Sequence, residues 1–233
     1  GTLSPRQVYA AARAAEPQID AETFLSELLW REFTHPTLSA HPHLSKRPYR
    51  PEFEGFPYQK PSAAVWRAWT EGKTGYPVVD ASARQLLAEG YVHNRARMIS
   101  ASFLTKHLLV DYRRGEAHYL AHLVDGDWAQ NNAGWQWSAG CGQDAQPYFR
   151  VFNPVSQGEK FDPEGVYVRR WVLVLAELET KHIHAPGLAP EKALARAGIR
   201  LGKDYPEPIV DHKEARERFL DLAKAHLRAA REA

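Results

Sequence analysis

Cysteine is almost missing from this chain of 233 residues, and long apolar runs are missing altogether. The single cysteine, Cys141, excludes a disulfide within this sequence and is typical of a reducing compartment, so we expect a cytoplasmic protein. No apolar run approaches the ~20 residues of a membrane span and no signal-peptide pattern is visible, so we expect no membrane partner. Alternation of polar and apolar residues, the mark of strands, is nearly absent too, which favours an all-α fold.

The rest of the composition is that of an ordinary globular domain. Apolar residues make up 44% of the chain and charged residues 25%, which argues against disorder. The length suffices for one sizeable domain or for two, no internal repeat is present, and we expect a single domain over residues 1–233. The formal net charge of +2 is too small to indicate a nucleic-acid partner by itself.

Helical spacing recurs along most of the chain. Ser4, Pro5 and Gln7 predict a capped helix that ends near Glu16, and Asp20 is expected to cap the next helix. Further helices are predicted over residues 66–70, 80–89, 93–114, 116–129 and 166–179, and from 213 onward.

A few residue types decide where these helices start and stop. Asp80 is expected to cap the helix 80–89 and Gly90 to end it, while Gly115 is expected to interrupt the helical pattern. The density of proline in residues 34–64 predicts an ordered long loop or a surface connector. The charged tail from Lys213 predicts a solvated amphipathic helix.

Two glycine-rich motifs and a group of histidines suggest ligand sites that we reject. EGKTG has Arg67 where a phosphate loop needs its first glycine, and GCGQDA follows no predicted strand, so neither a phosphate loop nor a dinucleotide fingerprint is expected. The histidines lack accompanying thiolates or a helical pair with a carboxylate, so we expect no metal site; they are His35, His41, His43, His182 and His184.

Residues 125–154, DGDWAQNNAGWQWSAGCGQDAQPYFRVFNP, hold three of the seven tryptophans and two adjacent asparagines. Tryptophan is costly to leave in water, whereas aspartate and asparagine are costly to bury without partners. A segment that wraps a large, flat ligand with polar edges would satisfy both groups. An irregular loop pinned by tryptophan is the alternative on composition alone.

Charged residues at two other places are informative. Glu27 lies in the apolar stripe of the second predicted helix, and on spacing alone its simplest role is an i,i+4 pair with Arg31. Asn94, Arg95 and Arg97 crowd the first turn of another predicted helix. Because basic residues there oppose the helix dipole, we expect negative charge nearby.

Several long motifs, in the same order along the chain, resemble the FAD-binding half of the DNA photolyase/cryptochrome family. The resemblance extends from Leu3 to about His212. It implies an all-helical domain that holds FAD in a U-shape next to a hole for damaged bases. The motifs are FLSELLWREF, EGKTGYPVVDA, HNRARMISASFL, DGDWAQNNAGWQW and YFRVFNPVSQGEKFD.

The resemblance assigns five residues to the cofactor. Asn131 matches the asparagine that faces flavin N5, and its amide can donate or accept a hydrogen bond. Arg97 and Asp125 match the ion pair beside the flavin ring. Asp127 matches a carboxylate near the ring's polar edge, and Arg31 matches a phosphate contact. These assignments supply the negative charge expected near the first turn of HNRARM.

It assigns further residues to the substrate, a cyclobutane pyrimidine dimer. Glu27 matches the glutamate that hydrogen-bonds the thymine bases; in an apolar pocket its pKa should rise, so that the acid can donate. Trp30 and Trp137 match the aromatic residues that cradle the flipped dimer. Asn94 and Met98 match the pocket lining, with Asn94 also near the cofactor. Two basic residues match contacts to DNA: Arg95 and Lys160.

The implied activity is light-driven repair. In this family, excited reduced FAD donates an electron to the dimer, while the protein binds and positions the reactants. Asn94 and Met98 replace the histidines of (6-4) photoproduct enzymes, and Asn131 replaces the aspartate of plant cryptochromes. Together with Glu27, Trp30 and Trp137, these residues favour a class I cyclobutane-dimer photolyase that acts on ultraviolet-damaged DNA as a monomer. A light-signalling cryptochrome that binds protein partners is the alternative.

The sequence departs from the family pattern at the electron relay. Family members use three tryptophans from flavin to surface for photoreduction. Here Trp135 and Trp69 match the inner and outer members, but the middle one is Tyr112, so photoreduction should be altered. Trp171 and Tyr119 are alternative relays.

The start of the chain is a second departure. The family's FAD-phosphate segment and an α/β antenna domain would precede Gly1, so we expect a fragment, with the antenna chromophore, of unknown identity, outside it.

Overall fold

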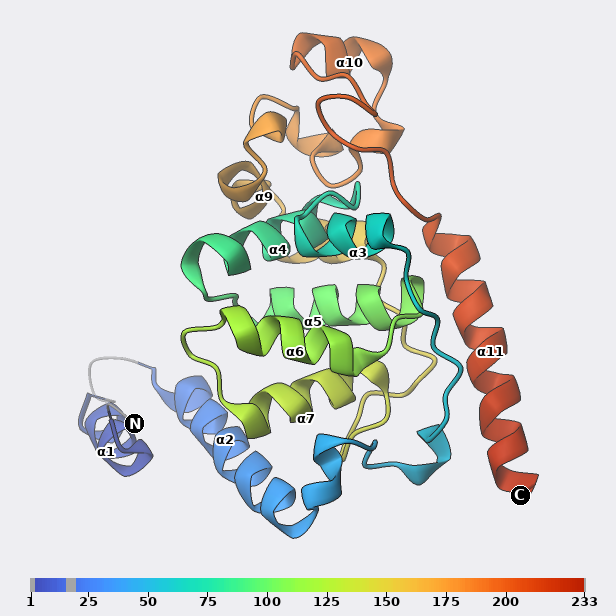
Figure 1. Ribbon diagram of the computed structural model, residues 1–233. Coiled ribbons are helices and arrows are strands. Elements are labelled where there is room, and N and C mark those ends of the chain that lie inside the picture. The colour runs from blue at the N-terminus through green and yellow to red at the C-terminus, as the bar shows by residue number, and fades with distance from the viewer. Residues whose placement is uncertain (1–2, 16–19, 233) are drawn as a thin grey trace.

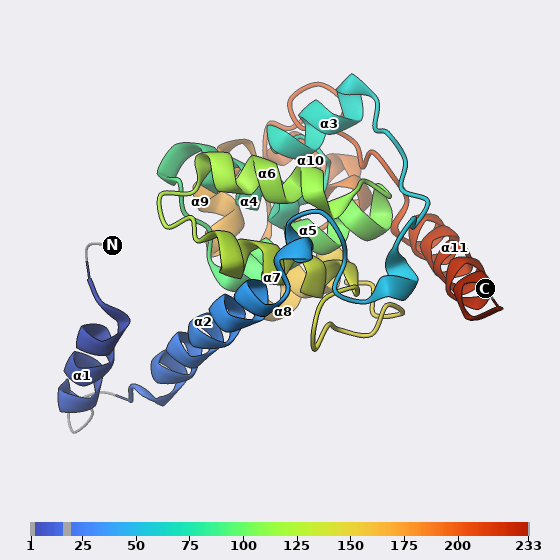
Figure 2. The same ribbon diagram turned by 60° about the horizontal axis from the view of Figure 1, so that its bottom comes forward.

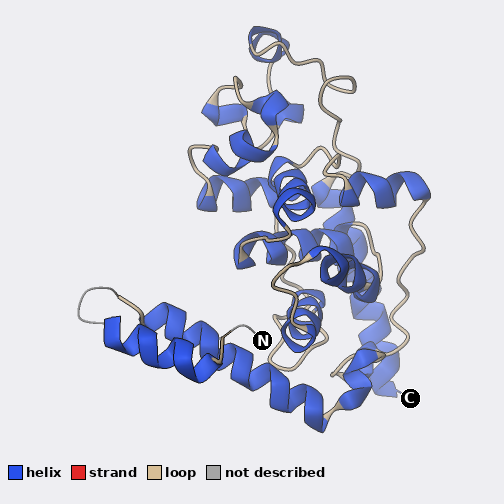
Figure 3. Ribbon diagram, turned by 60° about the vertical axis from the view of Figure 1, so that its left-hand side comes forward, coloured by secondary structure: helices blue, strands red, loops and turns tan. Residues whose placement is uncertain are grey.

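The computed structural model describes residues 3–15 and 20–232. Regular structure in these residues is helical, and Figure 3 draws no strand among them, so the all-α prediction is confirmed. In this part of the chain, no helix is both long enough and apolar enough to cross a membrane. The α-helices are α1 (Pro5–Ala15), α2 (Glu22–Ala40), α3 (Ala63–Thr70), α4 (Pro77–Glu89), α5 (Asn94–Ser102), α6 (Tyr112–His122), α7 (Trp128–Ala139), α8 (Pro154–Phe161), α9 (Val166–Trp171), α10 (Glu191–Arg196) and α11 (His212–Glu232).

The body of the molecule is built on α4, α5, α6 and α7. Figure 1 shows these helices stacked one below another, with α11 along one side. α5 packs against both α4 and α7, and α6 packs against α7. The largest buried side chains fill the space between these helices and form the main core. They include Trp69, Phe103, Leu104, Tyr119, Trp135 and Phe219.

A smaller core lies under α9 and α10, in the upper part of Figure 1. Asp80 joins it to the main body. Its carboxylate is fully buried and accepts hydrogen bonds from the Thr74 amide (2.7 Å), the Thr74 hydroxyl (2.6 Å) and the Tyr205 hydroxyl (2.6 Å). Asp80 therefore lies inside α4, which begins at Pro77, and the prediction that it caps this helix is wrong.

Helices α1 and α2 project from this body. Figure 2 shows α2 running outward from α7, with α1 beside its far end. Ser4 and Gln7 confirm the predicted helix start, because the Ser4 amide donates to Gln7 Oε1 at 3.0 Å. The predicted end near Glu16 lies outside the described residues. The N-cap residue of α2 is Ala21 and not the predicted Asp20. The Asp20 carboxylate nevertheless accepts a hydrogen bond from the Glu22 amide, at 3.2 Å.

Tertiary packing changes four of the predicted boundaries. α2 continues through Pro36 to Ala40, so the loop predicted from residue 34 starts too early; packing on α7 offsets the hydrogen bond that proline removes. The helix predicted over 93–114 is interrupted at 108–111, after a π-helical turn. The helix predicted over 116–129 is interrupted between the end of α6 and the start of α7, and the one predicted over 166–179 ends as an α-helix with α9.

The predicted solvated tail is also wrong. α11 runs along the main core and buries one face of its apolar stripe against it, which the charged sequence conceals. The buried residues are Ala215, Phe219, Ala223 and Leu227. Gly90 ends α4 in a left-handed conformation, as predicted.

Candidate functional site

Helix α7 is the element around which the predicted site residues gather. Asp127 caps it by accepting from the Gln130 amide at 2.9 Å, and Gly140 ends it with a φ of 91°. α7 packs against α2, α5 and α6, so residues on its different faces meet three neighbouring helices. This arrangement explains why polar and aromatic residues alternate irregularly in the sequence of α7.

The predicted ion pair between Arg97 and Asp125 is present. Nη2 of Arg97, on α5, lies 2.7 Å and 3.0 Å from the two carboxylate oxygens of Asp125, in the loop before α7. Nε of Arg97 donates to the Val92 carbonyl, and its guanidinium lies 5.6 Å from the ring centroid of Tyr91. Three contacts therefore hold the guanidinium, and Asp125 supplies the negative charge expected near this helix start.

Asn131 lies on α7 and is half-buried. Its Nδ2 donates to the Glu116 carbonyl at 3.0 Å, which orients the amide. One amide N–H and the carbonyl oxygen remain for a ligand. Within the described residues, the amide is thus anchored through one of its hydrogen-bonding groups only.

Asp127 has a second role that the sequence did not reveal. Its Oδ2 lies 2.8 Å from Nε2 of His35 on α2, while Oδ1 caps α7. The carboxylate therefore joins the start of α7 to α2, and its predicted cofactor contact competes with two structural hydrogen bonds. The contact of His35 with Asp127 could have been predicted only if the sequence had shown that α2 continues past residue 34.

A buried polar network behind α7 was also missed. Asn132 donates to the Glu116 carboxylate and to the Leu44 carbonyl, both at 3.0 Å, and Gln136 donates to Asn132 at 3.1 Å. Burial raises the pKa of Glu116, and the hydrogen bond from Asn132 opposes that rise. The i,i+4 spacing of Asn132 and Gln136 was the available signal. The network fixes residues 44–49 against α7, because Gln136 also accepts from the Tyr49 amide.

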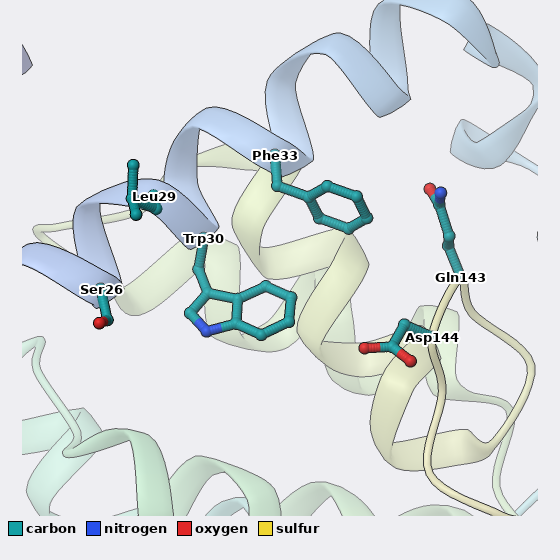
Figure 4. A pocket seen from close by; sticks show the side chains of 6 residues that line it. All are labelled: Ser26, Leu29, Trp30, Phe33, Gln143 and Asp144. Atoms are coloured by element: carbon teal, nitrogen blue, oxygen red, sulfur yellow. The ribbon is translucent and has the colours of Figure 1, made fainter. Parts of the chain in front are cut away.

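A cavity of about 550 Å³ opens between α2 and the loop after α7. Figure 4 shows Trp30 and Phe33 extending from α2 toward Gln143 and Asp144 on that loop. The two aromatic rings meet edge to face, with centroids 5.8 Å apart. Asp144 has a φ of 50°, a conformation rare outside glycine, asparagine and aspartate. Sequence reasoning found Trp30 but not the other three residues.

The structure does not gather all the predicted pocket residues at this cavity. Among the described residues its lining is Ser26, Leu29, Trp30, Phe33, Gln143 and Asp144. Trp137, Asn94 and Met98 lie elsewhere on α7 and α5. Glu27 is exposed on α2, so the apolar surroundings predicted for it are wrong. Arg31 pairs with Glu32 at 2.8 Å.

The two predicted DNA contacts lie together. Arg95, on α5, has its guanidinium carbon 4.2 Å from the ring centroid of Phe161, at the end of α8. Nζ of Lys160 lies 5.3 Å from the same centroid. Phe161 was not singled out from the sequence, because a phenylalanine at a helix end carries no pattern of its own.

The predicted order of the electron relay is wrong at its outer end. Trp69 is only 1% exposed, so it cannot be the surface member. Its ring meets that of Trp135 edge to face, with centroids 6.1 Å apart, and half-buried Trp66 lies 5.5 Å beyond it. Tyr119 contacts Trp135 and Trp69, at 5.3 Å and 6.0 Å. The ring contacts therefore run from Trp135 through Trp69 to Trp66.

Tyr112 does not join this series of ring contacts in the described structure. Its hydroxyl is buried and has no hydrogen-bond partner among the described residues. Burial raises the pKa of Tyr112 far above its ordinary value. A tyrosine that cannot pass its proton to an acceptor is a poor site for oxidation. Trp171, the other suggested alternative, likewise makes no ring contact with Trp69 or Trp135 within the described residues.

Comparison with known proteins identifies the family. The family described as the FAD binding domain of DNA photolyase matches residues 24–225. The deoxyribodipyrimidine photo-lyase of Agrobacterium fabrum is 50% identical over 223 residues, which cover 94% of this chain and 46% of that protein. The chain belongs to the family of photolyase FAD-binding domains, and it spans about half the length of the curated relatives it matches.

Solved structures agree. A bacterial class III photolyase from Agrobacterium tumefaciens superposes with a TM-score of 0.93 at 49% identity, covering 96% of this chain and 47% of that one. A cryptochrome from Synechocystis sp. PCC6803 superposes with a TM-score of 0.87 at 34% identity, covering 94% and 46%. The fold predicted from the sequence motifs, a helical FAD-binding domain, is confirmed.

The residues present suit FAD. Arg97 offers guanidinium N–H donors, Asp125 a carboxylate, and Asn131 both a donor and an acceptor, which together match the alternating carbonyl and N–H groups at the edge of a flavin ring. The contact between Asp127 and His35 joins the start of α7 to α2, the helix that carries Trp30 and Phe33 of the cavity.

Proposed function

We propose that this chain is the cofactor- and substrate-binding part of a photolyase that repairs cyclobutane pyrimidine dimers in ultraviolet-damaged DNA. The observation that carries the proposal is the cavity of about 550 Å³ beside Trp30 and Phe33. Its volume falls in the usual range of small-molecule sites, and its aromatic wall suits two stacked pyrimidines. The names of the relatives, 42–50% identical, support the same activity.

FAD is the cofactor that we propose for the polar part of the site. When bound, reduced and excited by light, it supplies the electron that opens the cyclobutane ring. Arg97, Asp125 and Asn131 would hold the ring edge, and the fixed guanidinium would favour extra negative charge on it. Asp127 and Arg31 are assigned to the cofactor as well. Arg31 is available for a phosphate because its partner Glu32 forms only an exposed, weak pair.

The substrate must leave the duplex before it reaches this cavity, as in other enzymes that act on bases. Trp30 would stack on the dimer. Trp137, which lies on α7 outside the lining of this cavity, is proposed to contact the dimer as well. Asn94 and Met98 are assigned to the lining between dimer and cofactor. Glu27 lies one turn before Trp30 on α2, so it reaches the same side of the helix and is proposed to hydrogen-bond the bases.

Electron supply to the cofactor is proposed to follow the ring contacts, from Trp66 through Trp69 to Trp135. We assign the surface position to Trp66, which is half-buried and carries the Arg114 guanidinium 4.3 Å from its ring centroid. We propose that the protein acts as a monomer. We also assign it to class I on its residues, while a solved structure 49% identical to this chain is that of a class III photolyase. An antenna chromophore would belong to the part of the relatives that this chain does not span.

Signalling without repair is the second candidate, favoured by the TM-score of 0.87 with a cryptochrome. Binding of the FAD-loaded chain to matched duplexes with and without a thymine dimer separates the two. A photolyase binds the dimer duplex more tightly, and Trp30→Leu reduces that preference by roughly 1–3 kcal/mol, the worth of one stacked base. Trp171→Leu, on α9, is the control. Equal affinity for both duplexes would contradict repair.

A further inference from the structure

Phe161 lies beneath two cations that come from different helices. The Arg95 guanidinium, on α5, lies 4.2 Å from the ring centroid and the Lys160 ammonium, on α8, lies 5.3 Å from it. Both distances fall within the range of attractive cation–π contacts. The ring is itself 45% exposed, so cations and ring share one accessible surface.

Among the described residues, no carboxylate neutralises either cation. Arg97 pairs with Asp125 and Arg170 pairs with Glu89, whereas Arg95 makes no ion pair in the part of the chain that the structure describes, and Lys160 makes none either. An aromatic ring holds a cation in place without cancelling its charge. The guanidinium therefore keeps N–H groups for an anion with several oxygens.

Hydrogen bonds and close packing hold the end of α8, the helix that carries the Phe161 ring. Nε2 of the buried His184 donates to the Asp162 carbonyl at 2.7 Å, and the Asp162 carboxylate accepts from the Tyr167 and Val168 amides at 3.0 Å and 3.1 Å. A Cβ on Gly158 would lie 2.4 Å from His184 Nδ1, so α8 packs directly on the imidazole. The end of α8 is thus anchored by hydrogen bonds and by close packing on His184.

We propose that Phe161 is a positioning residue for DNA binding: its ring fixes Arg95 and Lys160, the two cations already assigned to DNA, in place to meet the phosphates of a strand. The proposal rests on the DNA-binding function proposed above and adds a role for a residue to which no contact with DNA was assigned. Two cations held at fixed positions lose less side-chain freedom on binding than two free ones. Affinity should therefore depend on the ring even though the ring carries no charge.

The test is equilibrium binding of the FAD-loaded chain to a labelled duplex with one thymine dimer, over a series of salt concentrations. Arg95→Gln and Lys160→Gln should each flatten the dependence of log affinity on log salt by about 0.9, the value for one phosphate contact. Phe161→Leu should lower affinity roughly three- to tenfold, and Phe161→Tyr should restore it. Phe149→Leu, at a phenylalanine that is 60% exposed, is the matched control and should change nothing.

A double-mutant cycle isolates the positioning role. In a chain that already carries Arg95→Gln and Lys160→Gln, Phe161→Leu should have no further effect, because no cation remains to be held. An equal loss in both backgrounds, or wild-type affinity for Phe161→Leu, would overturn the inference while leaving the proposed function intact. Failure of the wild-type chain to bind the dimer duplex at low salt would overturn both.

Discussion

Gly115 of α6 lies against the indole of Trp135 on α7. A Cβ added to Gly115 would lie 2.2 Å from Cη2 and 2.4 Å from Cζ3 of that ring, closer than real atoms approach. The missing side chain lets the two helices come together and sets the position of Trp135, the proposed inner member of the electron relay. Sequence reasoning took Gly115 for a helix breaker, but it lies inside α6 for this packing reason.

Gly115→Ala should therefore destabilise the fold by about 1–3 kcal/mol, because the bulky ring must shift to admit the methyl group. Gly134→Ala, on the exposed side of α7 where nothing lies within 4 Å, is the matched control and should stabilise by about 0.5–1 kcal/mol. Urea unfolding measures both changes. Equal effects at the two glycines would contradict the packing account.

Tyr112→Phe should raise stability or leave it unchanged. The buried hydroxyl has no partner among the described residues, so its removal relieves a desolvation cost of about 1 kcal/mol. Tyr76→Phe should instead lower stability by about 1 kcal/mol, since the Tyr76 hydroxyl donates to the Val210 carbonyl at 2.8 Å. A loss of the same size at both positions would show that Tyr112 has an unseen acceptor.

The same variant tests the relay. With oxidised FAD bound and a thiol present, Tyr112→Phe should leave the rate of light-driven flavin bleaching unchanged, whereas Trp66→Phe should slow it. The reason is that ring contacts connect Trp66 to Trp135 through Trp69. Transient absorption should also lose a tryptophan radical signal in Trp66→Phe. Slow bleaching in Tyr112→Phe alone would restore Tyr112 as the relay.

Lys106 makes stability depend on pH. Its ammonium is buried, donates to the Arg150 carbonyl at 2.8 Å, and has a pKa lowered from 10.5 to about 7, chiefly because burial disfavours the charge. Between about pH 7 and pH 10.5 the unfolded chain then binds more protons than the folded chain, so stability rises with pH.

The slope from this one group is at most about 1.4 kcal/mol per pH unit. Lys106→Met should remove that contribution, and Lys60→Met, at an exposed lysine, should not. Urea midpoints measured from pH 7 to pH 10 provide the comparison. A slope that persists unchanged in Lys106→Met would assign the pH dependence to other groups.

The sequence correctly predicted the features that depend on residues close together in the chain or on a long motif. The Ser4–Gln7 cap, the end of α4 at Gly90 and the Arg97–Asp125 pair all depend on near neighbours or on a long motif. The misplaced features depend on distant partners. Asp80 was taken for a cap because its partner Tyr205 is far along the chain, and Pro36 was taken for a break because packing on α7 is invisible in the sequence.

The site follows the same division. Motifs identified Trp30 and Asn131, but no sequence pattern marks Asp144 or Phe161. The loop after α7 carries Asp144 to the cavity, and the anchored end of α8 places Phe161 next to Arg95. Trp66 was not assigned to the relay for a similar reason. Its ring lies against Arg114 and His118 of α6, and spacing along the chain does not reveal these contacts.

Light-dependent repair is the most direct test of the central claim. The FAD-loaded chain, with its flavin reduced, is incubated with DNA that carries thymine dimers, and intact thymines are counted after blue light and after darkness. The account predicts recovery of thymines in the light and none in the dark. Dimers that persist in the light, although FAD and DNA are both bound, would contradict it.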